Sequence, residues 1–281
     1  MAGMFRVEHA MHFTKMHGLG NDFMIIDVTR EHVDDPTALA LRLSDRRCGV
    51  GFDQLALVGK AEDADAALEF FNADGSPSAA CGNATRCIAR TLMDATGRPS
   101  VTLRTAQGLH ACRDVGSGLT AVNMGKPVFS WRDIPLAQEV DAKNLPIAGN
   151  PMALGMGNPH CVFFVRDIAD INLSEIGPGI EHHPLFPERC NVEWVEILSR
   201  TSLRMRIWER GAGVTRASGS GSCASAVAAV SRDLTERQVS VVTDGGDLQI
   251  DWTDDGVWMT GPTVRVYEGE LDPASMDARH G

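Results

Sequence analysis

The sequence predicts a mixed α/β protein made of two copies of one unit, and three observations lead to this prediction. Cys81-Gly82-Asn83-Ala84-Thr85 resembles Ser218-Gly219-Ser220-Gly221-Ser222, 137 positions further on. A repeat at one fixed offset is typical of a duplicated structural unit. With 281 residues, 43% of them hydrophobic, the chain can bury two ordinary cores. The same offset relates Gly20-Asn21 to Gly157-Asn158, Gln54 to Asn191, and Phe71-Asn72-Ala73 to Trp208-Glu209-Arg210.

The first copy shows apolar runs separated by turn-forming residues. A Gly-rich turn precedes the apolar run at 23–26, and residues 72–76 have strong turn chemistry. Gly97 and Pro99 end a helical pattern. We therefore expect strand, turn and strand over 12–28, a helix over 35–47, strands over 52–58 and 66–71, a helix over 82–96, and hairpins over 100–126.

The second copy repeats this order. Residues 203–208 alternate between apolar and polar, as in a half-buried strand. The Ala-rich run 223–230 is apolar on most sides, so its helix should be central and buried. Turns are predicted at 244–246 and 254–256. We expect strands over 161–165, 192–198 and 203–208, helices over 172–180 and 219–234, and hairpins over 239–269, with a cleft between the two units.

Composition excludes several kinds of partner. A formal charge of −11 argues against nucleic acid and against an anionic membrane surface. No apolar run is long enough to span a bilayer, and residues 1–10 lack the apolar block of a signal peptide. The seven cysteines are irregularly spaced and show no zinc-site pattern, so we expect reduced thiols, a cytoplasmic location and no metal.

Cys81 is the first candidate catalytic residue. It stands where the helix over 82–96 should begin, and backbone N–H groups there have no partner within the helix. The helix dipole adds positive charge, which lowers a thiol's pKa and also suits a substrate carboxylate. The alternative interpretation of a free cysteine is that it fills the core as a small apolar side chain. We prefer this interpretation for the other candidates, Cys87, Cys112, Cys161, Cys190 and Cys223.

Ser218 occupies the equivalent position in the second copy. Serine is also a good helix N-cap, and Ser-Gly-Ser-Gly-Ser could be a plain flexible turn. A hydroxyl needs an adjacent base to act in proton transfer. His160 could supply that base, or could tune Cys81, or could be a structural hydrogen-bonded histidine.

Glu209 and Arg210 can together bind the two charged groups of an amino acid. A guanidinium binds a carboxylate through two hydrogen bonds, while a glutamate accepts an ammonium group. A weak surface ion pair is the alternative reading. Several amide side chains at turns and strand ends favour a polar cleft, namely Asn21, Gln54, Asn72, Asn158 and Asn191.

These residues resemble the diaminopimelate epimerase family, whose members use two cysteines and no pyridoxal phosphate. The resemblance covers residues 11–272. It implies no cofactor, a homodimer, and two units in which a curled, mainly antiparallel sheet surrounds a central helix. The expected boundaries are 11–127 with a returning strand 265–272, and 128–264. The matching segments are MHFTKMHGLGNDFMIID (11–27), GVGFDQLAL (49–57), FNADGSPSAACGNATRC (71–87), GNPHCV (157–162), FPERCNV (186–192), WERGAGVTRA (208–217) and WMTGPTVRVYEG (258–269).

The resemblance also implies roles for individual residues. Cys81 removes the α-proton of LL-diaminopimelate, and the residue at 218 delivers a proton to the opposite face. His160 and Glu209 influence the pKa values of this pair. Gly82, Asn83, Gly219 and Ser220 hold the α-carboxylate at the two helix ends. The remaining substrate-binding residues are Asn21, Gln54, Asn72, Asn158, Asn191, Glu209 and Arg210.

Ser218 departs from the family pattern, which has its second cysteine there. Loss of a positioned general acid or base typically costs roughly 10²–10⁴ in rate. Three hypotheses follow: a diaminopimelate epimerase with weakened turnover, a paralogue acting on another amino acid as hydroxyproline epimerases do, or a binding protein that has lost catalysis. Retention of Glu209, Arg210 and the amides favours the first.

Overall fold

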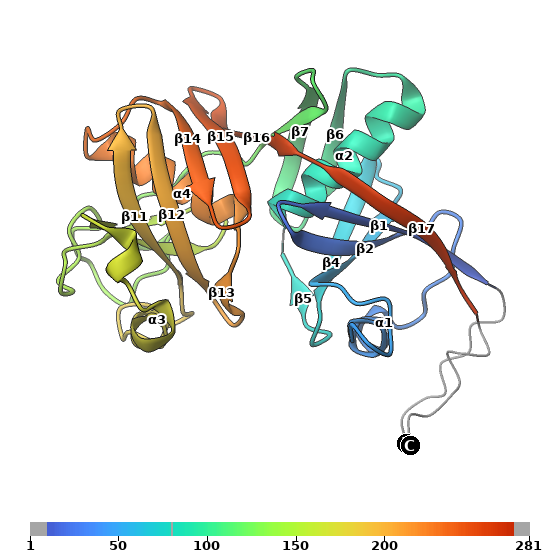
Figure 1. Cartoon of the computed structure of the whole chain (residues 1–281), viewed down its shortest axis with the longest axis horizontal. Coiled ribbons are helices and arrows are strands. Elements are labelled where there is room, and N and C mark those ends of the chain that lie inside the picture. Colours follow the sequence, from blue (N-terminus) through green and yellow to red (C-terminus); the bar gives the residue numbers. More distant parts are fainter. Residues whose placement is uncertain (1–9, 80, 273–281) are drawn as a thin grey trace. The chain divides into compact units, whose positions relative to one another are not determined.

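The computed structural model describes residues 10–79 and 81–272, and these form a mixed α/β fold dominated by strands, as predicted (Figure 1). The chain divides into two compact units. One contains the residues up to Thr120 together with those from Pro262 onward, and the other runs from Ala121 to Gly261. None of the helices in the described ranges has the length and apolar character needed to span a lipid bilayer.

The first unit is built on a mixed sheet that includes β17, which follows all the other described strands in sequence. The last strand, β17, pairs antiparallel with β1, so the sheet runs β17-β1-β2-β3-β4-β6-β7. The β2–β3 and β4–β6 pairs are parallel. The strands are β1 (Met11–Gly18), β2 (Asn21–Asp27), β3 (Gln54–Gly59), β4 (Ala66–Asn72), β5 (Pro77–Ser78), β6 (Ser100–Thr105), β7 (Gly108–Asp114) and β17 (Val264–Leu271).

Helix α2 (Gly82–Thr96) matches the expected range and packs against β1, β2, β6 and β7 (Figure 1). Its inward face includes Cys87, Ile88 and Met93, each at most 2% exposed. Gly97 ends the helix in the left-handed conformation, with φ of 68°. The central position predicted for this helix follows from that apolar face.

Helix α1 (Pro36–Leu43) is shorter than the expected range of 35–47. Asp35 caps its beginning by accepting a hydrogen bond from the N–H of Ala38 at 2.9 Å. Beyond Ser44, the carboxylate of Asp45 accepts the N–H groups of Arg47 and Cys48, both at 2.7 Å. These side-chain bonds favour a turn over continued helix.

The second unit repeats this arrangement in residues 121–261. Its sheet runs β9-β10-β11-β12-β14-β15-β16, with β8 beside β16 and β13 beside β12. The β10–β11 and β12–β14 pairs are parallel. The strands are β8 (Leu119–Asn123), β9 (Met152–Gly155), β10 (Pro159–Val165), β11 (Asn191–Ser199), β12 (Ser202–Glu209), β13 (Gly213–Thr215), β14 (Gln238–Thr243), β15 (Gly246–Thr253) and β16 (Gly256–Pro262).

Helix α4 (Gly219–Ser231) is buried along almost its whole length, as its Ala-rich sequence predicted. It packs against β10, β11, β12 and β15. It stops before the expected end at residue 234, with Arg232 as its C-cap. Helix α3 (Leu173–Glu181) covers β11 and β12, and a short 3-10 turn spans Ile168–Asp170.

Strand register confirms that the two units are copies. In the first, Phe23 of β2 lies opposite Gln54 of β3, and in the second His160 of β10 lies opposite Asn191 of β11. Each residue of the second pair lies 137 positions after its counterpart in the first pair, as predicted. After the central helices the offset becomes 138, since β6 begins at Ser100 and β14 at Gln238. The second unit is therefore one residue longer than the first at this point, after the segments whose offset the sequence analysis used.

Candidate active site

Cys81 is the N-cap of α2, as predicted. Its backbone is extended, with φ of −144°, and its sulfur accepts the N–H of Ala84 at 3.5 Å. The Sγ atom also lies 3.7 Å from Oδ1 of Asn21, to which Asn83 donates from Nδ2 at 3.3 Å. The structure thus brings two other predicted site residues, Asn21 and Asn83, together beside the thiol of Cys81.

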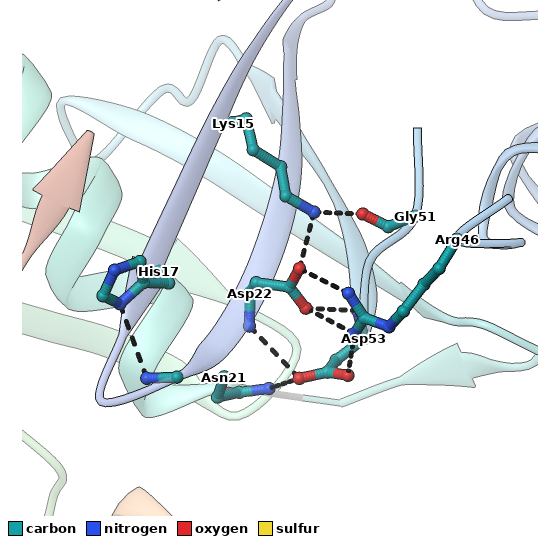
Figure 2. A network of polar contacts seen from close by, with 8 residues as sticks. Lys15, His17, Asn21, Asp22, Arg46, Gly51 and Asp53 are labelled. Carbon is teal, nitrogen blue, oxygen red and sulfur yellow. Dashed lines mark hydrogen bonds and ion pairs between the residues drawn. The ribbon is translucent and has the colours of Figure 1, made fainter. Parts of the chain in front are cut away.

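Asn21 is held by a network of charged residues between β1, β2 and the segment before β3 (Figure 2). Its Nδ2 donates to Asp53 at 2.9 Å, and Asp22 beside it pairs with Lys15 at 2.6 Å. Arg46 donates two hydrogen bonds of 2.8 Å to Asp22 and one of 2.7 Å to Asp53. Burial raises the pKa of Asp22, but hydrogen bonds from Arg46 and Lys15 outweigh it and lower the value from 3.8 to about 2.

Gln54 and Asn72 form a second predicted pair in this unit. They lie opposite each other where β3 begins and β4 ends. Nε2 of Gln54 donates to Oδ1 of Asn72 at 2.8 Å, and Asn72 donates to Ser76 at 3.0 Å. Asn83, in the first turn of α2, is 2% exposed, and its Oδ1 accepts no hydrogen bond from the described residues. This unit therefore offers amide groups and a helix N-terminus beside a thiol.

Ser218 is the N-cap of α4 and occupies the same position as Cys81. Its backbone is extended, with φ of −133°, and its hydroxyl accepts the N–H of Gly221 at 3.3 Å. The same hydroxyl donates to Oε2 of Glu209 at 3.0 Å. The Ser218 hydroxyl therefore contacts the carboxylate of Glu209, whereas His160, one of whose three expected roles was a base for Ser218, forms hydrogen bonds with Glu193 and Asn158. Gly219 and Ser220 form the first turn of α4.

Glu209, at the end of β12, is bound by hydroxyl groups on both oxygens. Thr215 of β13 donates to Oε1 at 2.5 Å, while Ser218 donates to Oε2. Burial raises the pKa of Glu209, although the hydrogen bonds from Thr215 and Ser218 oppose this effect. The nearby Glu193 raises it further, and His160 lowers it. Glu209 thus titrates above the ordinary range of a glutamate.

His160 lies on β10 between two acceptors and is fully buried. Its Nδ1 is 2.6 Å from Oε1 of Glu193 on β11, and its Nε2 is 2.8 Å from Oδ1 of Asn158. Burial raises the pKa of Glu193, and interaction with His160 opposes the rise. Oε2 of Glu193 is buried without a hydrogen-bond partner among the described residues.

Asn191 connects the start of β11 to Arg210. It donates from Nδ2 to the carbonyl of Pro159 at 3.1 Å, and its Oδ1 accepts the backbone N–H of Arg210 at 3.0 Å. The guanidinium of Arg210 is exposed and donates to the carbonyl of Glu188 at 3.1 Å. Arg210 and Glu209 thus direct their charged groups to different partners.

Sequence reasoning missed Glu193 and Thr215. Glu193 is a charged residue between the apolar Val192 and Trp194 in the buried part of β11, and it is 0% exposed. Thr215 lies in β13, a strand that was not expected. The fixed 137-residue offset could have pointed to Thr215. At that offset Thr215 is the counterpart of Ser78 in β5, the short strand that precedes Cys81.

Solved structures with the same fold define the class of protein. A hydroxyproline epimerase from Agrobacterium vitis superposes with a TM-score of 0.66 at 16% identity, covering 97% of this chain and 96% of that one. A protein of the phenazine biosynthesis PhzF family from Bacillus anthracis gives 0.67 at 16% identity, with 94% and 99% coverage. At this identity the likeness concerns the fold alone, and the chain has the duplicated α/β fold that these proteins share.

Sequence comparison then identifies the family. The family model described as diaminopimelate epimerase matches residues 13–130 and 152–266. The diaminopimelate epimerase of Rhodospirillum centenum is 48% identical over 266 residues, covering 92% of this chain and 91% of that protein. That of Acidiphilium cryptum is 46% identical over 269 residues, with 94% and 97% coverage. The chain belongs to the diaminopimelate epimerase family, as its motifs predicted.

Proposed function

We propose that the protein is an isomerase that converts LL-2,6-diaminopimelate to the meso form, a step toward lysine, and that it does so without pyridoxal phosphate or another cofactor. One observation carries the proposal within this family: Cys81 and Ser218 cap equivalent helices, and each side chain accepts the backbone N–H three residues further on. A thiol and a hydroxyl thus occupy equivalent positions in the two copies of one unit.

In the proposed reaction two groups, Cys81 and Ser218, act on opposite faces of one α-carbon. The thiolate of Cys81 takes the α-proton, and the electron pair remains on the carbon, stabilised by the adjacent carboxylate. N–H groups at the starts of α2 and α4, around Gly82–Asn83 and Gly219–Ser220, suit that carboxylate because helix N-termini favour negative charge. A proton from the Ser218 side then forms the new C–H bond. The products are the inverted centre, the neutral thiol of Cys81 and a donor on the Ser218 side that has lost one proton. Proton exchange with water returns both groups to their starting states.

The remaining predicted residues suit the distant amino-acid group of the substrate. Diaminopimelate carries a second ammonium and carboxylate, and Arg210 with the amides of Asn21, Asn72, Asn158 and Asn191 offers donors and acceptors for both. Gln54 holds Asn72 in place. Oδ1 of Asn83, which is buried without a donor among the described residues, suits an N–H group.

The test is isotope exchange with LL- and with meso-diaminopimelate in deuterium oxide, following α-proton loss and inversion separately. Inversion of both isomers supports the proposal, and Cys81→Ala should abolish exchange from the LL isomer. Exchange without inversion would show that Cys81 works alone. Inversion of hydroxyproline but not diaminopimelate would favour a paralogue, and binding without exchange would favour a non-catalytic protein.

We also propose a cytoplasmic homodimer. A reduced cytoplasm keeps a free and accessible thiol such as that of Cys81 from oxidation. Strand β17 exposes three apolar side chains, Val264, Val266 and Tyr267, at 42%, 51% and 44%. Neighbouring exposed apolar residues are typical of protein contacts. Sedimentation should give a dimer mass, and Val266→Glu should shift it toward the monomer.

A further inference from the structure

We infer that Asp53 is a positioning residue for Cys81: its carboxylate fixes the direction of the Asn21 amide, so that the amide oxygen faces the thiol. The contacts that support this inference all lie within the first unit, and its consequence for proton transfer rests on the proposed function. Asp53 directly precedes β3, and Figure 2 shows its carboxylate beside the Asn21 side chain.

The neighbours of an asparagine amide set its direction, because the oxygen only accepts hydrogen bonds and the nitrogen only donates them. Nδ2 of Asn21 lies 2.9 Å from Oδ2 of Asp53, and a carboxylate only accepts. The same oxygen accepts the backbone N–H of Asp22 at 3.1 Å, and Arg46 donates to the other oxygen at 2.7 Å. Asp53 is therefore held in place, and the nitrogen of Asn21 points toward it.

The oxygen of the same amide faces Cys81. The S–H group donates to Oδ1 of Asn21, with Sγ and Oδ1 3.7 Å apart, and the sulfur accepts the N–H of Ala84 at 3.5 Å. These two contacts favour different forms of the side chain, because an N–H donor stabilises the thiolate and an oxygen acceptor stabilises the thiol. Cys81 thus has a partner for each of the two forms between which a proton transfer moves it.

Asn83 does not fix the direction of the Asn21 amide by itself. Its Nδ2 donates to Oδ1 of Asn21 at 3.3 Å, while its own Oδ1 is buried and accepts no hydrogen bond from the described residues. If both amides turned over, Nδ2 of Asn21 would donate to Oδ1 of Asn83, and this oxygen would gain a donor. The carboxylate of Asp53 opposes that exchange, because turning the Asn21 amide would place two oxygens against each other.

The charged and titratable side chains around Asn21 are bonded to one another or to the backbone. They are Lys15 and His17 on β1, Asp22 on β2, and Arg46 and Asp53 between α1 and β3. Asp53 binds the Asn21 side chain directly. A change at Asp53 should therefore reach the thiol through one amide.

In the proposed reaction this amide acts on the product of the first proton transfer. The thiolate of Cys81 takes the α-proton, the electron pair of the broken C–H bond remains on the α-carbon, and the new S–H group donates to Oδ1 of Asn21. The amide oxygen thus stabilises the thiol that the step forms. If the amide were turned over, its nitrogen would stabilise the thiolate instead and make it a weaker base.

The test is Asp53→Asn, which keeps the size of the side chain but can donate as well as accept, so it no longer fixes the Asn21 amide. Alkylation of Cys81 by iodoacetamide, followed across pH by mass mapping, measures the proportion of thiolate. We expect the midpoint of this profile to move to lower pH, and the rate below the midpoint to rise roughly 3- to 10-fold, as for one hydrogen bond. The plateau at high pH should not change, since every Cys81 is ionised there in both proteins. Wash-out of an α-deuterium label from LL-diaminopimelate should fall.

Two comparisons separate this role from a structural or purely electrostatic one. Asp27→Asn is the matched control and should change neither measurement, because Asp27 ends the same strand β2 and its carboxylate binds Thr29. Asn21→Ala alone should also move the profile to lower pH, since the thiol loses its acceptor. Adding Asp53→Asn to Asn21→Ala should then produce no further shift, whereas a direct effect of the Asp53 charge on Cys81 would persist.

An alkylation profile that stays in place in Asp53→Asn would overturn the inference and leave the proposed function intact. So would a rate that rises equally at every pH, which indicates a loosened structure, or an undiminished effect of Asp53→Asn in the Asn21→Ala background. A wild-type protein that exchanges the α-proton of neither isomer would instead overturn the proposed function.

Discussion

Asp22→Asn should destabilise the protein strongly, because Asp22 is the shared partner of Lys15 and Arg46. The side chains of Asp22 and Lys15 are only 15% and 8% exposed. A pKa held at about 2 instead of 3.8 corresponds to about 2.5 kcal/mol of stability at neutral pH, at about 1.36 kcal/mol per unit. The variant also leaves a buried ammonium without its counter-charge, so we expect a total loss of about 2–5 kcal/mol.

The sign of the pH dependence follows from the lowered pKa of Asp22. Its contribution is fully present above the unfolded pKa of 3.8 and is lost as the pH falls through the folded value of about 2. By pH 3 about 1 kcal/mol of the 2.5 should be gone. Denaturant unfolding of wild type and Asp22→Asn at pH 7 and pH 3 measures this, and the difference between the two proteins should shrink at pH 3.

The control is Asp63→Asn, which removes a comparable pair between an aspartate and Arg104 at the surface. Those side chains are 52% and 40% exposed, so solvent screens the pair and little stability should be lost. A loss from Asp63→Asn as large as that from Asp22→Asn would refute the reasoning. So would a stability difference between wild type and Asp22→Asn that does not change with pH.

Two other predictions concern packing and thiol access. Gly177→Ala should lower stability by about 1–3 kcal/mol, since its Cβ would lie 2.6 Å from Cγ of Trp208. Gly179→Ala in the same helix meets nothing within 4 Å and should be neutral or stabilising by up to about 1 kcal/mol; thermal unfolding of both tests this, and equal effects would contradict it. In the native protein, a thiol reagent at neutral pH should modify Cys48 and Cys81 only, because the other five thiols are buried and burial raises the pKa of Cys87 and Cys112 to about 12. Mass mapping of labelled peptides measures this, and rapid labelling of Cys87 or Cys112 would contradict it.

The repeated elements could be predicted well because their signals are local. The start of α2 at Gly82 could be predicted because turn-forming polar residues precede it. Its end could be predicted because Gly97 and Pro99 end the helical pattern. The Ala-rich run likewise identified α4 as buried. The ends of α1 and α4 were overestimated. At α1 the reason is that the bonds from the Asp45 side chain to the backbone are not visible in hydrophobic periodicity.

Strands set by tertiary pairing were harder to predict. The short strands β9 and β13 were missed, since neither shows an extended alternating pattern. Strand β13 exists because it pairs with β12, which brings Thr215 to Glu209. Local sequence does not encode such pairing.

The candidate site was predictable where a residue type sits at a repeated position, as with Cys81 and Ser218. The hydrogen-bond partners of these residues were harder to predict from the sequence. Glu193 reads as an ordinary surface glutamate, and its burial against His160 depends on the parallel pairing of β10 with β11. His160 was expected as a possible base for Ser218, but its ring nitrogens face Glu193 and Asn158.

The pairing of β17 with β1 makes the order of synthesis differ from the order along the sheet. Residues 121–261 leave the ribosome as one uninterrupted stretch and can fold while translation continues. Among the described strands, β1 emerges before the others, yet its neighbour β17 is made after the others, so until then one edge of β1 lies open to mispairing. A nascent chain halted before Val264 should therefore protect its later half from protease and leave its earlier half vulnerable.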